Sequence, residues 1–124
     1  MTTAYWCVLI AALMPYVASS VAKAGGERYN NRNPRRWLDQ QQGFRARANA
    51  AQANGFEAFP FFAAAVIVAH LTHAPQDRID ALAVIFIVAR VAYFLCYLAD
   101  WHWARSIAWT IGFVATITIF VTGS

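Results

Sequence analysis

Two ionisable residues stand inside long apolar stretches, where a charge is costly and therefore usually serves a function. Glu57 follows an alanine-rich segment, and Arg90 lies within the run VIFIVARVAYF. Arg90 is expected about 7 Å closer to the outer surface than Glu57, a gap that an arginine side chain can span, so the two could form an ion pair that holds two helices together. They could equally bind a small charged ligand, and these residues alone leave both interpretations open.

Each of the two residues belongs to a polar stripe. Arg47, Asn54 and Glu57 are separated by seven and three residues, a spacing that places them on one face of a helix. A stripe of this kind should face the protein interior, because lipid does not solvate polar side chains. Asn54 could also serve only to bridge two helices, a common use of asparagine in membranes.

A second stripe accompanies Arg90, because Tyr93, Tyr97 and Asp100 follow it at spacings of three, four and three residues. Counting about 1.5 Å per residue from the turn between the two helices, Glu57 lies about 24 Å deep and Tyr93 about 21 Å deep. The stripes are therefore nearly level and predict one pocket that opens toward the cytoplasm. It suits a small polyanionic or zwitterionic ligand whose apolar co-substrate arrives from the lipid.

Other roles remain open for several of these residues. The two tyrosines could belong to an interfacial aromatic belt, as could Trp109, and Arg105 at the start of the last helix could anchor the topology. The three histidines share no ligand-like spacing, so no metal site is expected. Cys7 and Cys96 lie in apolar runs and are interpreted as small buried hydrophobic residues. No phosphate-binding loop or nucleophilic triad motif is present.

The elements that position these groups follow from composition. Of the 124 residues, 60% are hydrophobic and only 13% are charged, whereas about 25% are charged in ordinary soluble domains. A chain this short has too little interior to bury so much apolar surface, which points to lipid. We predict an all-α, polytopic membrane protein with a single domain over residues 1–124, built as a four-helix bundle. The expected transmembrane helices cover about 4–22, 44–72, 78–98 and 103–121.

Charge predicts the topology. Seven of the ten basic residues lie from Lys23 to Arg47, and five of these seven belong to the expected polar loop from Lys23 to about Gly43. This loop should face the cytoplasm, with both termini on the outer side. No charged side chain precedes Lys23, so the first helix is expected to be retained rather than cleaved as a signal peptide. The net charge of +4 reflects this topology, and nucleic acid is not an expected partner.

Two segments carry a resemblance to a known family. RANAAQANGFEAFP at 47–60 and RVAYFLCY at 90–97 resemble the second-helix and third-helix signatures of the MAPEG family, the membrane-associated proteins in eicosanoid and glutathione metabolism. The resemblance covers essentially the whole chain and is strongest to small bacterial members. It implies a homotrimer with active sites between neighbouring subunits, placed in the bacterial inner membrane.

The resemblance also implies chemistry. Better-known members bind glutathione on the cytosolic side and transfer it to lipophilic electrophiles, reduce lipid hydroperoxides or isomerise prostaglandin peroxides. Arg105 resembles the family arginine that stabilises the glutathione thiolate, the reactive form of the thiol. Lys23 lies where the family has a basic residue closing the first helix. Five residues expected to bind glutathione match the family by position, namely Gln52, Asn54, Glu57, Tyr93 and Tyr97. Arg90 is added to this set as the cation of the same pocket.

Two positions depart from the family pattern. Ala50 stands where glutathione-using relatives often have an arginine, and Ala58 stands where some have a tyrosine. The first expectation is a glutathione-dependent transferase or peroxidase with glutathione as co-substrate and a lipophilic small molecule as second substrate. The alternative is a non-catalytic membrane protein that binds a lipid or small metabolite and uses its polar stripe for helix packing. A transporter is disfavoured because no inverted repeat is found.

Overall fold

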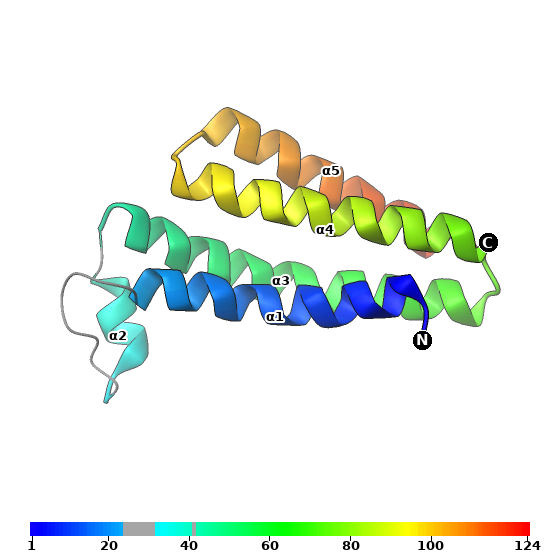
Figure 1. Ribbon diagram of the computed structural model, residues 1–124, viewed down its shortest axis with the longest axis horizontal. Helices are drawn as coiled ribbons and strands as arrows, with labels where there is room; N and C mark the ends of the chain where they lie inside the picture. Colours follow the sequence, from blue (N-terminus) through cyan, green and yellow to red (C-terminus); the bar gives the residue numbers. More distant parts are fainter. Residues whose placement is uncertain (24–31, 41) are drawn as a thin grey trace.

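A computed structural model describes residues 1–23, 32–40 and 42–124, and these residues are helical apart from short turns (Figure 1). The predictions of an all-α fold and of four membrane-crossing helices are confirmed, because four of the helices are long and apolar enough to span a bilayer. The helices are α1 (Thr3–Lys23), α2 (Pro34–Asp39), α3 (Phe44–Leu71), α4 (Gln76–Leu98) and α5 (His102–Val121).

The short helix α2 lies where a polar loop was expected, so that prediction was wrong for these six residues. The side-chain oxygen of Asn33 accepts a hydrogen bond from the backbone N–H of Arg36, and Pro34 occupies the first helical position. Both features favour a helix start. Trp37 and Leu38 are buried and attach the helix to the bundle. The rest of the expected loop, residues 24–31 and 41, lies outside the described residues.

The four long helices run alongside one another, with α1 packed most extensively against α3 and α4 against α5 (Figure 1). Both chain termini lie at the end of the bundle that holds the turn between α3 and α4. Helix α2 and the turn between α4 and α5 lie at the opposite end. The segments with the chemically interesting residues therefore meet in the half of the bundle that carries α2.

Small residues dominate the helix contacts. In a bilayer the apolar environment does not drive helices together, and close approach of small residues supplies packing instead. A Cβ atom at Gly55 would lie 2.9 Å from the Pro15 side chain, so α1 and α3 approach each other closely there. Phe62 and Phe86 stack in the core with ring centroids 3.9 Å apart. The fully or nearly fully buried alanines include Ala4, Ala48, Ala65, Ala69 and Ala83.

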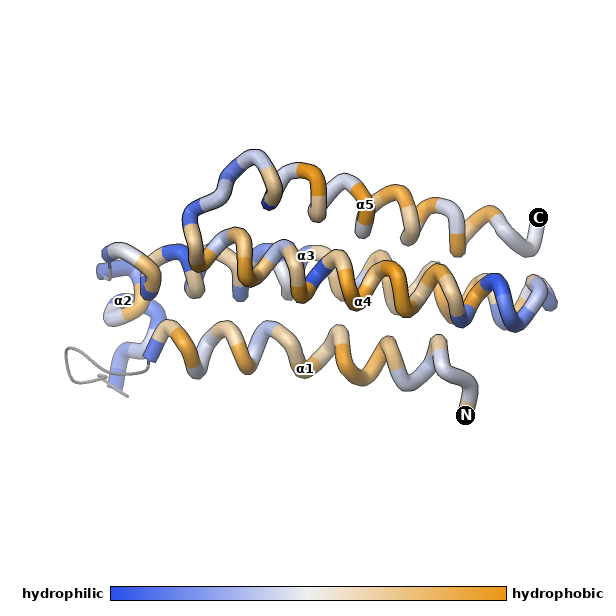
Figure 2. The backbone as a smooth tube through the Cα atoms, turned by 45° about the horizontal axis from the view of Figure 1, so that its top comes forward, coloured by the Kyte–Doolittle hydropathy of each residue, from blue (hydrophilic) through white to orange (hydrophobic). Residues whose placement is uncertain are grey.

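The outer surface of the long helices is apolar. Figure 2 shows mostly hydrophobic residues along α1, α3, α4 and α5 and hydrophilic residues gathered toward the ends of the bundle. Large side chains that are exposed on this surface include Leu13, Val17, Val88, Leu95, Ile107 and Val114. A continuous apolar surface of this kind is unsuited to water and matches the hydrocarbon of a bilayer.

The first turn of α1 is attached to α4 by a side chain. Asp80 Oδ1 accepts a hydrogen bond of 2.9 Å from the backbone N–H of Ala4 and another of 2.8 Å from the Gln76 amide. Nearby, the ring of His70 stacks on Tyr5 with centroids 3.9 Å apart. An acidic group at a helix start satisfies a backbone donor that has no partner within the helix.

Candidate functional site

The centre of the candidate site is a hydrogen bond between α3 and α4. Arg90 Nη1 donates to Asn54 Oδ1 at 2.8 Å, and Arg90 is only 7% exposed. In the part of the chain that the structure describes, the guanidinium pairs with this amide and not with Glu57. The ion pair considered from the sequence is therefore wrong as a description of this contact. The amide is neutral, so the positive charge of Arg90 is left without compensation from it.

Two arginines and two tyrosines form a row along α4 and onto α5. The guanidinium carbon of Arg90 lies 4.3 Å from the ring centroid of Tyr93. The rings of Tyr93 and Tyr97 meet edge to face, with centroids 5.5 Å apart and planes at 78°. Arg105 lies over Tyr97 at 4.3 Å. Each cation rests on an aromatic face, a favourable arrangement that fixes its position while its N–H groups stay directed sideways.

Two cavities adjoin this row. The polar cavity has a volume of about 180 Å³ between α3, α4 and α5, and Asn54, Glu57 and Arg90 supply its polar wall. The tyrosine cavity has a volume of about 250 Å³ and is lined by Tyr93, Tyr97 and Arg105 together with residues of α5. Trp109 lines both cavities and therefore lies between them. Together they form a site with an arginine on each side and a carboxylate and an amide near one of them.

Binding of an anion is the chemistry that this arrangement supports best. A guanidinium has five N–H donors in a planar fork, and one of those of Arg90 is used by Asn54. A buried charge is costly unless it is paired, so the remaining donors favour a negatively charged ligand. The described residues contain no group of three or more His, Cys, Asp or Glu side chains that could hold a metal ion.

Gln52 is not brought to this site within one chain. It lines neither the polar cavity nor the tyrosine cavity, because it lies two residues before Asn54 and two residues turn a helix by about 200°. Its side-chain oxygen is buried and has no hydrogen-bond partner among the described residues. Glu57 does line the polar cavity, yet it is exposed on the surface of the chain.

Two members of the predicted stripes lie elsewhere. Arg47 donates from Nε and Nη2 to the carbonyl oxygen of Leu98, at 3.2 and 3.1 Å, and so binds the end of α4 instead of facing the pocket. Asp100 is exposed in the turn after α4, with a positive φ of 61°. Its predicted place on the stripe was wrong because α4 ends at Leu98, and the helical spacing does not continue past that residue.

Sequence reasoning missed most of the contribution of α5. Trp109 was considered for the interfacial belt, but it lines both cavities and stacks on Phe113 with centroids 5.0 Å apart. From Arg105, the spacings of four, four and three residues lead to Trp109, Phe113 and Thr116, which is the period of one helix face. That period was the signal that could have identified them. The other α5 residues lining the two cavities are Ser106, Thr110 and Gly112.

The two cysteines differ in their surroundings. Both are free thiols; Cys7 is buried in the core, as expected, whereas Cys96 is only partly buried. Neither lines the polar cavity or the tyrosine cavity.

Comparison with known proteins identifies one relationship. A family model described as the MAPEG family matches residues 3–123 of the 124-residue chain. The match therefore includes α1, α3, α4 and α5 together with every residue of the site. Neither a curated protein nor a solved structure matches the chain.

Proposed function

The chain belongs to the MAPEG family, and from this premise we propose that it is a membrane-bound, glutathione-dependent transferase or peroxidase that acts on lipophilic electrophiles or hydroperoxides. Membership supports a membrane protein of glutathione or eicosanoid metabolism. The observation that supports the finer proposal is the row of Arg90, Tyr93, Tyr97 and Arg105 beside the polar cavity.

The charges of the site complement those of glutathione, which carries two carboxylates and one ammonium group. Arg90 offers its remaining N–H donors to a carboxylate, while Glu57 in the same cavity suits the ammonium group. Asn54 holds the Arg90 fork in position through its side-chain oxygen. A ligand bound there would place its thiol near the tyrosine cavity, where Arg105 lies.

Arg105 is the proposed catalytic residue. A guanidinium beside a thiol favours the thiolate, which is the nucleophile. In transfer, the sulfur attacks the electrophilic carbon, the S–C bond forms, and the leaving group departs with the bonding electrons. In hydroperoxide reduction, the sulfur attacks the terminal oxygen, the O–O bond breaks and the alkoxide takes a proton to become an alcohol. A second glutathione then converts the resulting sulfenic acid to the disulfide, with release of water.

The proposed assembly is a homotrimer, as the family resemblance implies. Glu57 is exposed within an apolar span, and a charged side chain that faces the hydrocarbon of the lipid is costly. Gln52 has a buried side-chain oxygen without a partner in the described residues. A neighbouring subunit that covers Glu57 would remove the cost of exposing its charge. Gln52 lies about 140° from Glu57 around α3, so it would meet a different neighbour in the trimer and contribute to the site of that copy.

A non-catalytic protein that binds a lipid or small metabolite is the second candidate. Ala58 lines the polar cavity with a methyl group where some relatives have a phenol, and Ala50 replaces an arginine that is frequent in glutathione-using relatives. Both changes remove polar contacts to a peptide ligand. The membrane spans and the apolar walls between the helices are compatible with this candidate as well.

Glutathione binding distinguishes the two candidates. Calorimetry on the detergent-purified protein should detect a Kd in the micromolar to millimolar range for the wild type. Glu57→Gln should weaken binding by about tenfold or more, since a charged contact is lost. Asp77→Asn is the matched control, because Asp77 is exposed at the far end of α4, and it should bind like the wild type. A folded, oligomeric protein without detectable binding would favour the non-catalytic candidate.

A further inference from the structure

A third cavity lies on the opposite side of Arg90 from the polar cavity. This apolar cavity has a volume of about 290 Å³ and lies between α1, α3 and α4. Its walls are aliphatic and aromatic except at Arg90 and Tyr93, and the Arg90 guanidinium is bonded to Asn54, a residue of the polar cavity. An apolar cavity of this size does not hold ordered water, because water needs polar partners there.

The apolar cavity occupies one half of the membrane. On α4 its lining extends from Phe94 to Phe86, and α4 ends at Leu98. At about 1.5 Å per residue the cavity therefore begins about 6 Å and ends about 18 Å from that helix end. The hydrocarbon core is about 30 Å thick, so one leaflet spans about 15 Å. The cavity is thus about 12 Å long, lies mainly in the leaflet on the α2 side, and can hold most of the length of an acyl chain in that leaflet.

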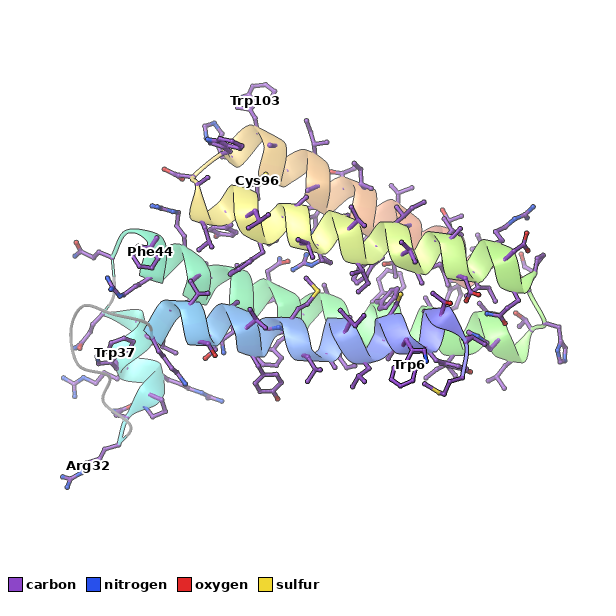
Figure 3. All side chains as sticks on the ribbon, viewed as in Figure 1. Trp6, Arg32, Trp37, Phe44, Cys96 and Trp103 are labelled. Atoms are coloured by element: carbon purple, nitrogen blue, oxygen red, sulfur yellow. The ribbon has the colours of Figure 1, made fainter. Side chains whose placement is uncertain are left out.

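Helix α2 lies at the end of the bundle toward which the apolar cavity extends. Its Trp37 and Leu38 belong to a buried cluster against which Phe94 packs, and Phe94 also lines the apolar cavity. Figure 2 shows α2 beside the end of α1, and in Figure 3 Arg32 is directed away from the bundle. The apolar side of α2 thus continues the wall of the cavity toward the membrane surface.

The outer side of α2 is basic. Arg35 and Arg36 are both exposed there, and a hollow of about 220 Å³ is lined by Asn33, Arg36, Trp37 and Gln40. Basic residues at the membrane surface attract anionic head groups, and guanidinium groups bind phosphate through paired hydrogen bonds. The basic hollow shares Trp37 with the buried cluster against which Phe94 of the apolar cavity packs, so Trp37 and Phe94 connect the hollow to that cavity.

We propose that the apolar cavity and the basic side of α2 together bind one phospholipid with an anionic head group, taken from the leaflet on the α2 side. An acyl chain fills the apolar cavity, and the phosphate lies against Arg35 and Arg36. The formal net charge of +4 disfavours a second copy of the chain as the occupant of this basic surface. The apolar cavity shares Arg90 with the polar cavity, but lipid retention is measured without glutathione, so failure of this proposal is distinguishable from failure of glutathione binding.

Native mass spectrometry of the full chain can test the site with defined lipids. The probes are dioleoylphosphatidylglycerol and dioleoylphosphatidylcholine, which share their chains and differ in head-group charge. The wild type should retain the anionic phosphatidylglycerol about tenfold more strongly than the zwitterionic phosphatidylcholine, because each arginine near the head group adds to binding. Val91→Trp should remove retention of the anionic lipid, because Val91 is an exposed wall residue of the cavity and indole would fill it.

Matched controls separate the cavity from general effects. Val88→Trp adds the same ring one turn away on α4, outside the cavity lining, and should behave like the wild type. Arg35→Gln with Arg36→Gln should abolish the preference for the anionic lipid, whereas Arg78→Gln, exposed at the far end of the bundle, should not. Should Val91→Trp fail to fold, Val17→Trp fills the cavity from α1.

Three results would overturn the proposal. The first is equal lipid retention by Val91→Trp and Val88→Trp. The second is equally tight binding of dihexanoylphosphatidylglycerol, whose short chains leave the apolar cavity unfilled. The third is a change in the number of chains per particle caused by Val91→Trp, which would show that a second copy fills the cavity.

Discussion

Arg47, near the start of α3, donates two hydrogen bonds to the carbonyl oxygen of Leu98, the last residue of α4. The carbonyls at a helix end have no partner within the helix, so this contact satisfies one of them. Because α5 begins only a few residues later, the same contact fixes the turn that leads to Arg105. Arg47 is thus a positioning residue for the proposed catalytic arginine.

Arg47→Gln should therefore affect both stability and activity. Loss of a charged hydrogen-bond donor at the α4 end should reduce the free energy of unfolding by about 2 kcal/mol. Thermal unfolding in one detergent checks this, with Arg78→Gln as the control on the outer surface of α4. Turnover should fall while the KM for glutathione stays unchanged, and Arg47→Lys should recover part of the loss. An unchanged melting temperature would contradict the role of this contact.

The contact between Asp80 and the backbone of Ala4 gives a second prediction. Asp80→Ala removes the acceptor for a backbone N–H in the first turn of α1, at a cost of about 1 kcal/mol. The expected result is faster hydrogen exchange in the first turn of α1, while exchange in α5 is unchanged. Asp77→Ala, in the first turn of α4, is the control. Equal exchange in both variants would show that the Asp80 bond does not stabilise α1.

Ala50 offers a gain of function. It lies four residues before Asn54 and seven before Glu57, on the same face of α3. Ala50→Arg should supply the cation that many glutathione-using relatives have there and should tighten glutathione binding by about tenfold. Gln42→Arg adds the same charge at an exposed position before α3 and should leave the Kd unchanged. If both variants tighten binding equally, net charge rather than the site is responsible.

The number of chains in the proposed trimer can be measured directly by mass. Native mass spectrometry of the wild type should give particles of three chains, since the exposed charge of Glu57 in an apolar span calls for a neighbour on α3. Glu57→Leu should not dissociate these particles, because an apolar residue is tolerated at a helix contact in lipid. Monomers that bind glutathione as tightly as the wild-type preparation would contradict a shared site.

Hydropathy was enough to predict the four long helices, because each must present about 20 apolar residues to cross a bilayer. Helix α2 was not predicted because it is shorter than the windows on which helical periodicity depends, although Asn33 and Pro34 form a recognisable helix start. Asp100 was assigned to a stripe because spacing alone does not reveal that a helix has ended. The end of α4 depends on a positive φ at that residue.

Within the site, the sequence predicted which residues gather but not which contacts they make. Arg90 and Asn54 were both expected in the pocket, yet the hydrogen bond between them depends on the relative rotation of α3 and α4. Opposite charges made Glu57 the obvious partner for Arg90. Trp109 was assigned by residue type, and its cavity position follows from which face α5 turns toward α4.

The most direct test of the central claim is a titration of the glutathione thiol in the bound state, followed by thiolate absorbance. A free cysteine thiol has a pKa of about 8.5, and Arg105 should lower the pKa of bound glutathione below that of the free tripeptide. In Arg105→Ala, glutathione should still bind at Arg90, but its thiol should titrate as it does in solution, whereas Arg78→Ala should match the wild type. Wild-type protein whose bound glutathione titrates like free glutathione would contradict thiolate activation.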